Sequence, residues 1–419
     1  MARTTRRYSL LSLIREGRRH HSGWAPAWRK AQLRRSYDVV IVGGGGHGLA
    51  TAYYLAKRFG VRDVAVIEKG WLGGGNTARN TTIVRSNYLH QPSMALYGLS
   101  HGMFEGLTAE LNFNTWFSPR GLIELAFSQD ELDSLSRTAD ANAQFGIKSW
   151  MIPASEARSI LPLLGDPVPE GRLLGALWQP RGGVANHNAV AWGYARAAAR
   201  LGVDIIENCD VESVLTVNGR TTGVRTAQGD VAAGAVVLAA AAGSAGLAQS
   251  AGVHLPLEAT SLSAFVSEPL KPVLDVVVLC GAKRPYLSQA NTGELVIGGA
   301  TDGHPSLSPG GSLRAVEDTA ASLISLFPSF AALRMMRQWA GTVDLTPDRS
   351  PILGPAGPDR LYLSCGWGTG GFKAIPAAGL ITASTTVHGK PHALVQPFTL
   401  DRFTSGRLVD ETAASAVAH

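Results

Sequence analysis

The spacing of hydrophobic residues between positions 39 and 67 changes from that of a strand to that of a helix and back again. Residues 39–42 are a short β-branched run, residues 49–59 carry apolar side chains at helical spacing, and residues 64–67 form a second short apolar run. This pattern predicts a strand, a helix and a second strand. Gly43, Gly45 and Gly48 stand between the first strand and the helix, and Glu68 follows twenty residues after Gly48. The stretch predicts a dinucleotide-binding βαβ unit.

Each glycine of this motif has a separate physical role. Gly43 permits the tight turn, Gly45 lets the backbone approach a pyrophosphate, and Gly48 lets the helix pack closely on the strand. The helix then points its free N–H groups at the phosphates, and Glu68 accepts hydrogen bonds from ribose hydroxyls. The motif alone leaves nicotinamide and flavin cofactors open. The predicted cofactor contacts of this unit also include Gly46, His47 and Lys69.

A second glycine-rich loop follows directly after the acid, in residues 71–88, and passes into a short strand. A loop of this composition can hydrogen-bond a pyrophosphate or the edge of a flavin ring, or it can be a plain surface loop. Its candidate cofactor residues are Gly75, Asn76, Thr77 and Arg79. Arg85 comes next, either as a charge at the rim or as a bidentate clamp for a substrate carboxylate.

The remaining pattern alternates between helix and strand. His187 is predicted just before a helix with Asn188 as its N-cap, where the imidazole stays neutral and serves as a nucleophile, an acceptor or an ordinary loop histidine. Residues 211–243 predict a hairpin and a buried strand that ends near Gly243, and residues 312–326 predict a helix. Residues 361–365 predict a strand, and a last glycine loop follows it with the candidate residues Gly368, Gly370, Gly371, Phe372 and Lys373.

Because glycine loops hundreds of residues apart must meet at one sheet edge, the predicted nucleotide domain is discontinuous. The expected fold is mixed α/β and α+β, with a Rossmann-like FAD-binding domain and a substrate domain built on a mostly antiparallel sheet. The expected FAD-binding segments are 36–120, 182–255 and 340–400, and the expected substrate segments are 121–181 and 256–339. Residues 1–35 are a basic arm and residues 401–419 a C-terminal tail.

Composition narrows the class of protein. With 419 residues, 45% hydrophobic and 17% charged, the chain is typical of a soluble two-domain protein, and no apolar run is long enough to span a membrane. Its three cysteines match neither a disulfide framework nor a zinc site, and no metal site is expected, so a reducing compartment, the cytoplasm, is favoured.

The positive charge of the chain is concentrated at its start. Residues 1–35 hold ten basic residues and one acid, which is +9, and the other 28 basic and 31 acidic residues sum to −3. This arm can be a solvated tail, a surface for an acidic partner, a transit peptide or an export signal at Arg6 and Arg7, of which the first two are favoured. Nucleic-acid binding is not supported, because no aromatic residues alternate with basic ones across a fold.

Together the motifs resemble a known family. Residues 39–57, 68–89, 181–193, 266–272 and 365–374 carry the resemblance, and the start of the chain adds to it. The chain is similar to the β subunit of heterotetrameric sarcosine oxidase, within the superfamily of D-amino-acid oxidase and glycine oxidase. The resemblance covers nearly all of residues 37–419.

This resemblance implies the cofactors, partners and reaction. It implies noncovalent FAD at Gly43, Gly45, Gly48 and Glu68, FMN joined covalently through His187, and Arg85 and Lys373 as the catalytic residues. The implied partners are the α, γ and δ subunits of a heterotetramer. The implied reaction is oxidation of sarcosine by hydride transfer to FAD, with electrons passing to FMN and O₂. Its products are glycine, hydrogen peroxide, and formaldehyde or methylenetetrahydrofolate. A flavin dehydrogenase for another N-methyl or imino acid and a noncatalytic FAD-binding scaffold are the alternatives.

Overall fold

The computed structural model describes residues 9–23, 26–166, 171–281, 285–306 and 310–409. Arg6 and Arg7, the site of the disfavoured export-signal alternative, and the last ten residues of the predicted tail lie outside these described residues. The three cysteines, Cys209, Cys280 and Cys365, are buried and free. Among the described helices, none is both long and apolar enough to cross a membrane.

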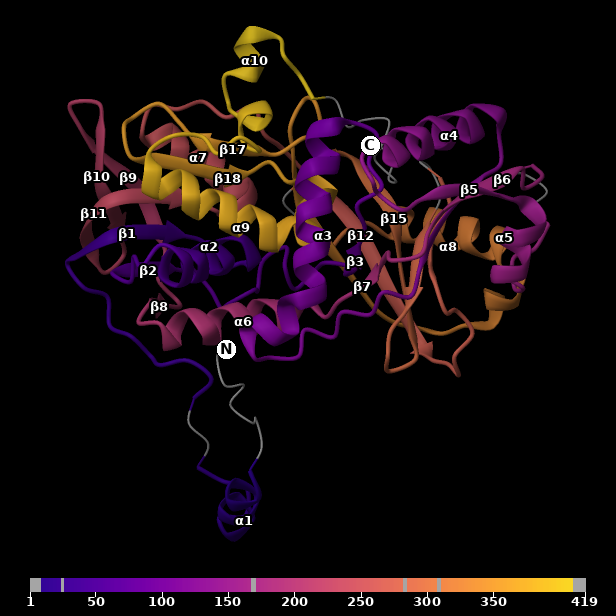
Figure 1. Cartoon of the computed structure of the whole chain (residues 1–419), viewed down its shortest axis with the longest axis horizontal. Coiled ribbons are helices and arrows are strands. Elements are labelled where there is room, and N and C mark those ends of the chain that lie inside the picture. The colour runs from indigo at the N-terminus through magenta and orange to yellow at the C-terminus, as the bar shows by residue number, and fades with distance from the viewer. Residues whose placement is uncertain (1–8, 24–25, 167–170, 282–284, 307–309, 410–419) are drawn as a thin grey trace.

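The first sheet is the Rossmann-like layer, and its central strands are parallel (Figure 1). Its main order is β17-β18-β11-β1-β2-β8, and β9 and β10 extend β11 as an antiparallel hairpin. The strands are β1 (Ser36–Val42), β2 (Val64–Ile67), β8 (Asp204–Ile206), β9 (Val211–Val217), β10 (Arg220–Thr226), β11 (Gly229–Leu238), β17 (Ile352–Pro355) and β18 (Leu361–Cys365). The predicted discontinuity is thus visible in the sheet, since its strands come from three separate parts of the chain.

The second sheet is mostly antiparallel, with one parallel pair between β13 and β4. Its order is β16-β12-β15-β14-β13-β4-β6-β5. The strands are β4 (Leu122–Ala126), β5 (Trp150–Pro153), β6 (Gly175–Gln179), β12 (Glu258–Pro269), β13 (Val277–Leu279), β14 (Tyr286–Gln289), β15 (Glu294–Pro305) and β16 (Met335–Leu345). A short pair, β3 (Ile83–Val84) and β7 (Gly183–Val184), lies apart from both sheets. The mixed fold predicted from the sequence is confirmed.

Helices cover the sheets and connect their strands (Figure 1). They are α1 (Leu10–Arg18), α2 (Gly46–Arg58), α3 (Gln91–Leu111), α4 (Gln129–Gln144), α5 (Ala154–Ile160), α6 (His187–Arg200), α7 (Ser244–Ser250), α8 (Leu313–Leu326), α9 (Gly371–His388) and α10 (Arg402–Ser405). Short 3₁₀ turns occur at Ala241–Gly243, Pro328–Ala332, Gly368–Gly370 and Gln396–Phe398.

Three local expectations need correction. The predicted boundary between residues 339 and 340 cuts through β16, which pairs with β12 of the second sheet as far as Leu345. The N-cap of α6 is Asn186 and not Asn188, because Asn186 is extended and its side chain accepts a hydrogen bond from the Ala189 N–H at 2.9 Å. His187 is therefore the first residue of α6. The helix of the βαβ unit begins inside the glycine motif, at Gly46.

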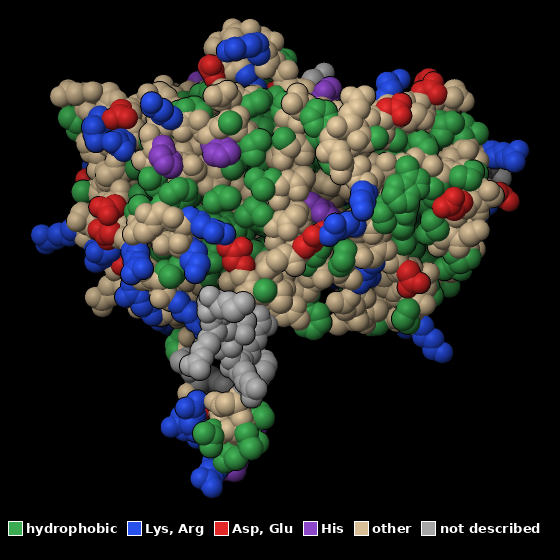
Figure 2. Space-filling model, viewed as in Figure 1, with side chains coloured by type: hydrophobic (Ala, Val, Ile, Leu, Met, Phe, Trp, Pro, Cys, Tyr) green, Lys and Arg blue, Asp and Glu red, His purple; other side chains and the backbone are tan. Residues whose placement is uncertain are grey.

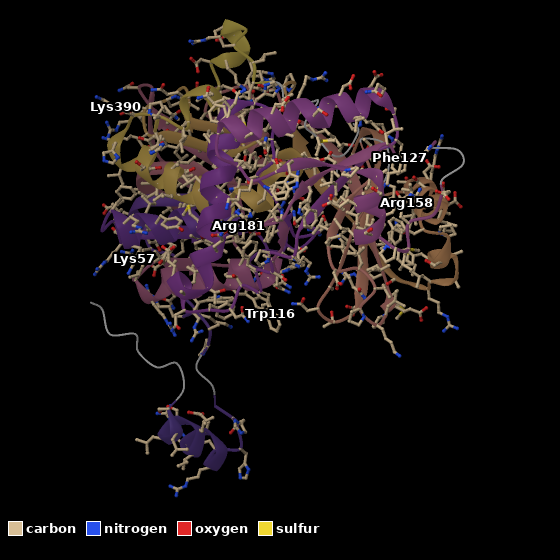
Figure 3. The ribbon with its side chains drawn as sticks, turned by 45° about the vertical axis from the view of Figure 1, so that its right-hand side comes forward. Lys57, Trp116, Phe127, Arg158, Arg181 and Lys390 are labelled. Carbon is tan, nitrogen blue, oxygen red and sulfur yellow. The ribbon has the colours of Figure 1, made fainter. Side chains whose placement is uncertain are left out.

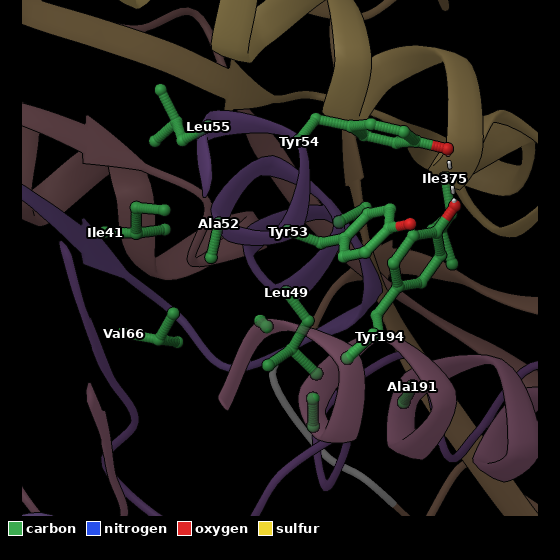
Figure 4. Packing of buried hydrophobic residues seen from close by; sticks show 14 of the residues in the cluster. Ile41, Leu49, Ala52, Tyr53, Tyr54, Leu55, Val66, Ala191, Tyr194 and Ile375 are labelled. Atoms are coloured by element: carbon green, nitrogen blue, oxygen red, sulfur yellow. Dashed lines mark hydrogen bonds between the residues drawn. The ribbon is translucent and has the colours of Figure 1, made fainter. Parts of the chain in front are cut away.

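The main core lies between the first sheet and helices α2, α6 and α9. Alternate residues of β1 serve opposite faces: Val39 and Ile41 join this core, whereas Val40 and Val42 join a second core on the other face. Figure 4 shows Tyr54 of α2 and Tyr194 of α6 meeting in the main core, where their hydroxyl groups are 3.3 Å apart. This hydrogen bond satisfies two polar atoms that burial would otherwise leave without a partner.

The arm joins the body through its last residues. Arg29 and Arg34 both pair with the buried carboxylate of Asp204 in β8, and the Tyr37 hydroxyl donates to the same carboxylate at 3.2 Å. Further out, α1 stands away from the body and exposes Leu10 and Leu11 beside basic residues (Figure 2). The positive charge of the arm is thus partly used inside the fold.

The predicted C-terminal tail is anchored at its start. Arg402 and Asp348 form a buried bidentate pair, with Nε to Oδ2 at 2.8 Å and Nη2 to Oδ1 at 2.9 Å. The Val409 N–H also donates to Asp348 at 3.1 Å. Burial alone would raise the pKa of Asp348, but the hydrogen bonds and charge of Arg402 hold it below its usual value. This pair ties residues 402–409 to the segment between β16 and β17.

Replacing Arg402 tests this anchor. Arg402→Ala leaves a buried carboxylate unpaired, and we expect a loss of about 3–5 kcal/mol in the free energy of unfolding, measured by urea denaturation. The matched control is Arg407→Ala, whose side chain is 78% exposed, with an expected change below about 0.5 kcal/mol. Because the folded pKa of Asp348 is lowered, the difference between wild type and Arg402→Ala should shrink as pH falls through that pKa. Equal urea midpoints for the two variants at neutral pH would contradict the anchor.

Candidate functional site

The glycine turn after β1 has the geometry that a phosphate-binding turn requires. Gly43 has a φ of +113°, and a Cβ there would lie 2.4 Å from the Ala239 carbonyl oxygen after β11. A Cβ on Gly48 would lie 2.0 Å from the Gly43 carbonyl oxygen, so only glycine lets α2 pack this closely. At Gly45 a Cβ would meet one atom within 4 Å, the Thr77 hydroxyl oxygen at 3.3 Å. Since Gly45 caps α2 without a side-chain hydrogen bond, the N-terminus of α2 is open to an anion.

Glu68 braces the turn from the end of β2. Its two carboxylate oxygens accept from the backbone N–H groups of Gly44 at 2.7 Å and of Gly70 at 2.9 Å. Lys69 beside it is exposed and points to no described partner. The carboxylate therefore sits at the strand end where a ribose would be held, and its present bonds fix its orientation.

The second glycine loop lies against the first. The Gly46 N–H donates to the Thr77 hydroxyl at 3.0 Å, which joins the two loops directly. The amide of Asn76 donates to the Thr342 carbonyl in β16, and the Trp339 indole donates to the Arg79 carbonyl at 2.8 Å. A Cβ on Gly75 would meet no atom within 4 Å. This loop therefore connects the nucleotide turn to the second sheet and leaves one open backbone position.

His47 connects the first glycine turn to the last one. Its Nε2 lies 3.0 Å from the Gly371 carbonyl oxygen, and its ring stacks on Trp367 with centroids 4.3 Å apart. Because a carbonyl can only accept, Nε2 carries the proton and Nδ1 is a bare acceptor. Burial lowers the pKa of His47 to about 3, so the ring is neutral. The buried Nδ1 has no partner among the described residues.

Asp344 of β16 forms a hydrogen bond to the backbone of the last glycine loop. One of its carboxylate oxygens accepts from the Gly366 N–H at 2.6 Å. Burial raises the pKa of Asp344 to about 6, against the opposing effect of backbone hydrogen bonds from Gly366, Trp367 and Gly368. The loop then enters α9 at Gly371, so Asp344 holds the segment that precedes this helix. Residues of the second sheet thus position a loop of the first.

A pocket lies where these loops meet the second sheet. Arg85 and Lys373 both line it, together with loop and sheet residues. The lining is Asn76, Arg79, Asn80, Thr81, Ile83, Arg85, Leu262, Ala264, Leu279, Tyr286, Gly341, Val343, Gly368, Thr369 and Lys373. The structure therefore brings both predicted catalytic cations into one cavity, although 288 positions separate them in the sequence (373 − 85).

Arg85 is fixed by its own neighbours. It is 5% exposed, and its Nη1 donates to the Asn87 backbone carbonyl and to the Asn87 side-chain oxygen, both at 3.1 Å. Its guanidinium also lies over the ring of Tyr88, with Cζ 4.6 Å from the ring centroid. A guanidinium held in this way presents a fixed positive charge to the pocket.

Lys373 lies in the first turn of α9 and is 8% exposed. Its Nζ donates to the Thr369 carbonyl at 3.1 Å, and its own backbone carbonyl accepts from the Ser100 hydroxyl of α3 at 2.6 Å. Burial, and secondly the charge of Arg85, lower the pKa of Lys373 to about 7. The side chain is therefore close to the midpoint of its titration at neutral pH.

His187 follows the end of β7 by three residues, at the start of α6. The residue two positions before it, Ala185, donates its N–H to the Thr82 carbonyl at 3.1 Å, next to the pocket-lining residues Thr81 and Ile83. The His187 Nδ1 is buried without a partner among the described residues. Burial lowers the pKa of His187 to about 4, so the imidazole is neutral at pH 7. A neutral ring with a free nitrogen is available for bonding.

Two other predicted residues occupy less direct positions. Phe372 is buried in the main core and packs near Phe104, so only its backbone can reach a cofactor. Gly243 ends a 3₁₀ turn four residues after Ala239, at the carboxyl end of β11.

Arg181, labelled beside α3 in Figure 3, forms an ion pair with Glu105 of that helix. This ion pair connects the segment before β7 to α3.

The sequence alone missed several residues of the site. Tyr286, Thr369 and Asp344 were not candidates, although the first two line the pocket and the third holds its glycine loop. For Thr369 a signal existed, since it lies between the glycines of the last loop. Tyr286 and Asp344 occur in ordinary strand patterns, so the sequence offered nothing to distinguish them.

These features suit a bound flavin dinucleotide. The open helix terminus at Gly45, the uncovered position at Gly75 and the bare acceptor on His47 all lie along loops in direct contact. Backbone N–H groups suit a pyrophosphate, and a pocket lined by Arg85 and Lys373 lies where the loops meet the second sheet.

Comparisons with known proteins identify the family of the chain. The model of the FAD dependent oxidoreductase family matches residues 38–385. The chain is 49% identical over 414 residues to sarcosine oxidase subunit beta of Rhodobacter capsulatus, covering 99% of this chain and 100% of that protein. It is 45% identical over 410 residues to the same subunit of Rhizobium meliloti, covering 98% and 99%.

Solved structures show the same fold. L-proline dehydrogenase from P. horikoshii superimposes with a TM-score of 0.84 at 27% identity and covers 90% of this chain and 100% of that one. Glycine oxidase from Geobacillus kaustophilus gives a TM-score of 0.79 at 27% identity, with coverage of 88% and 99%. The resemblance inferred from the motifs is confirmed: this chain belongs to the family of sarcosine oxidase β subunits, which are FAD-dependent amine-oxidising enzymes.

Proposed function

We propose that the chain binds FAD and oxidises sarcosine, an N-methyl amino acid. The observation that carries this proposal is the buried pocket in which Arg85 and Lys373 line one end of the predicted FAD site. Two cations that share a small cavity favour an anionic ligand, and a carboxylate is the anion of an amino acid. The names of the most similar relatives support sarcosine as that amino acid.

Arg85 is the proposed carboxylate clamp. Its hydrogen bonds to Asn87 and its contact with Tyr88 leave little freedom to the guanidinium, so less entropy is lost when a carboxylate binds. The apolar side chains of Leu262, Ala264 and Leu279 line the same pocket. In this environment the clamp orients the N-methyl group of the substrate.

FAD, when bound, supplies the two-electron acceptor for the hydride of the substrate's N-methyl group. The proposed holding residues are the glycines of the first motif with Gly46, His47, Glu68 and Lys69, the second loop with Gly75, Asn76, Thr77 and Arg79, and Gly243, Gly368, Gly370, Gly371, Phe372 and Lys373. Arg85 and Lys373 also place positive charge beside the ring, which lowers the energy of negative charge there.

A second flavin is proposed at His187. Its neutral imidazole and unpartnered Nδ1 support covalent attachment of FMN, through which electrons would reach O₂ to give hydrogen peroxide. The carbon product would be formaldehyde, or methylenetetrahydrofolate on another subunit, beside glycine. The name of the relatives, subunit beta, supports a complex with further subunits. The proposed complex is a heterotetramer with α, γ and δ chains, and the cytoplasm is the proposed compartment.

A dehydrogenase for a cyclic imino acid is the second candidate, favoured by the similarity to L-proline dehydrogenase. The two functions differ in substrate and in electron acceptor. Rates with sarcosine and with L-proline, each measured with O₂ and with an artificial dye as acceptor, separate them. Sarcosine oxidation that consumes O₂ supports the first function, and dye-dependent oxidation of proline alone supports the second.

Arg85→Ala tests the carboxylate clamp. Loss of charge-assisted hydrogen bonds to the carboxylate should cost about 2–3 kcal/mol, or on the order of 30- to 150-fold in kcat/KM for sarcosine. Arg85→Lys keeps the positive charge but loses the bidentate geometry of the guanidinium. Its kcat/KM should therefore lie between those of wild type and Arg85→Ala. The control is Arg225→Ala in β10, an exposed residue paired with Asp230, whose kinetics should match wild type. Unchanged KM and kcat in Arg85→Ala would exclude the clamp.

His187→Ala tests the covalent flavin. After acid precipitation, wild-type protein should keep one flavin in the pellet and release FAD to the supernatant, whereas His187→Ala should keep none and release the same amount of FAD. The control is His254→Ala, an exposed histidine, whose pellet should stay yellow. A His187→Ala pellet that retains its flavin would show that the attachment lies elsewhere.

A further inference from the structure

The chemistry of the substrate raises a question that the carboxylate clamp does not answer. This inference rests on the proposed function, the oxidation of an N-methyl amino acid. At neutral pH such a molecule is a zwitterion with a secondary ammonium group. Removing a hydride from its N-methyl group requires the nitrogen lone pair, so the ammonium must first lose a proton. The pocket therefore needs a proton acceptor close to the bound substrate.

Few described groups in the pocket can accept a proton. The guanidinium groups of Arg79 and Arg85 carry only hydrogen-bond donors and offer no acceptor. Burial raises the pKa of Tyr286, so its phenol stays neutral and protonated. The fourth titratable side chain of the described lining is the amine of Lys373.

Two further titratable groups lie behind this lining. His47 is engaged with Gly371 and Trp367 on the side of α2. Glu124 in β4 is outside the lining, on a strand that pairs with β13 next to Leu279. Burial raises the pKa of Glu124, and the charge of Arg85 opposes that rise. Glu124 is therefore the alternative acceptor that an experiment must separate from Lys373.

The surroundings of Lys373 favour its neutral form when no substrate is bound. The side chain is 8% exposed, its Nζ bonds a single described acceptor, the Thr369 carbonyl, and Arg85 lies nearby as a second cation. No ion pair among the described residues includes Lys373. A buried amine without a counter-ion costs less free energy neutral than charged, in agreement with its pKa of about 7.

We propose that Lys373 accepts the proton of the substrate's ammonium group as the substrate binds. One N–H bond of the ammonium breaks and leaves its electron pair on the substrate nitrogen, while the lone pair of Nζ forms a new N–H bond. The substrate becomes a carboxylate with a neutral amine, and the lysine becomes an ammonium ion. The carboxylate held by Arg85 is then the counter-ion that Lys373 lacked. Total charge is unchanged, and no proton passes to water.

The test compares two ligands on the flavin-loaded enzyme, isolated with its partner subunits. Methoxyacetate has the methyl group and carboxylate of sarcosine with an ether oxygen in place of the ammonium, so it brings the counter-ion without a proton. Binding is followed by the change in flavin absorbance, and proton uptake by an indicator dye in weak buffer. At pH 8, a lysine whose pKa rises from about 7 to its ordinary value should take up about 0.9 proton per bound methoxyacetate.

Sarcosine should behave differently in the same assay. When sarcosine is mixed with the enzyme without oxygen, it should bind before the flavin is reduced and bleached. In this binding phase the solution should neither gain nor lose protons, because the proton that Lys373 takes up comes from sarcosine itself. Release of about one proton to the solvent in that phase would overturn the proposal, and so would methoxyacetate binding without uptake. Both results would leave the carboxylate site intact. Failure of methoxyacetate to bind would instead overturn the carboxylate site, and with it the proposed function.

Variants identify the acceptor. Lys373→Arg keeps the cation but cannot titrate, so it should bind methoxyacetate with no proton uptake and release about one proton when sarcosine binds. Lys373→Met should bind methoxyacetate more weakly, also without uptake. Glu124→Gln should keep the uptake of wild type. Loss of uptake in Glu124→Gln together with normal uptake in Lys373→Arg would assign the proton to Glu124 and contradict the proposal. An unchanged far-UV circular dichroism spectrum verifies the fold of each variant.

Discussion

The close packing of α2 against α9 is the constraint on which the site depends. A Cβ on Gly379 would lie 2.4 Å from the Ala50 Cβ, and a Cβ on Gly46 would lie 2.3 Å from the Ile375 side chain, so the two helices touch through glycines. His47 adds a hydrogen bond to Gly371 at the point where α9 begins. This contact sets the distance between the phosphate turn on α2 and Lys373 on α9. One end of a long ligand is thereby positioned relative to the other.

The described side chains that line the pocket include basic residues but no carboxylate, so the pocket lacks negative charge. Arg85 and Lys373 are both buried, and Lys373 has no ion-pair partner among the described residues. Burying a cation such as Lys373 without an ion-pair partner costs stability, which indicates a functional role for this side chain. The fold limits this cost in two ways: Asn87 and Tyr88 support Arg85, and the lowered pKa of Lys373 lets part of the population stay neutral. A carboxylate removes the deficit, and the proposed proton transfer follows from the same imbalance.

Local patterns along the chain predicted much of this arrangement, and contacts between distant segments could not be predicted. The βαβ unit and the strand before the last glycine loop follow from periodicity and glycine spacing, which act within a few residues. The end of β16 was placed too early because its pairing with β12 is set by a strand about eighty residues away. Asp344, Tyr286 and the Arg402–Asp348 pair have no local signature, since each gains its role only from partners brought by the fold. The N-cap of α6 was missed by two residues because two asparagines flank His187 and either could cap the helix.

The central claim is that three glycine segments from distant parts of the chain form one FAD site that ends at a pair of cations. A crystal structure of the FAD-loaded enzyme with methoxyacetate tests this claim most directly. It should show the pyrophosphate at Gly43–Gly48, the flavin ring beside the last glycine loop, and the carboxylate between Arg85 and Lys373. A flavin ring placed away from residues 368–373, or a carboxylate that contacts neither cation, would contradict the account.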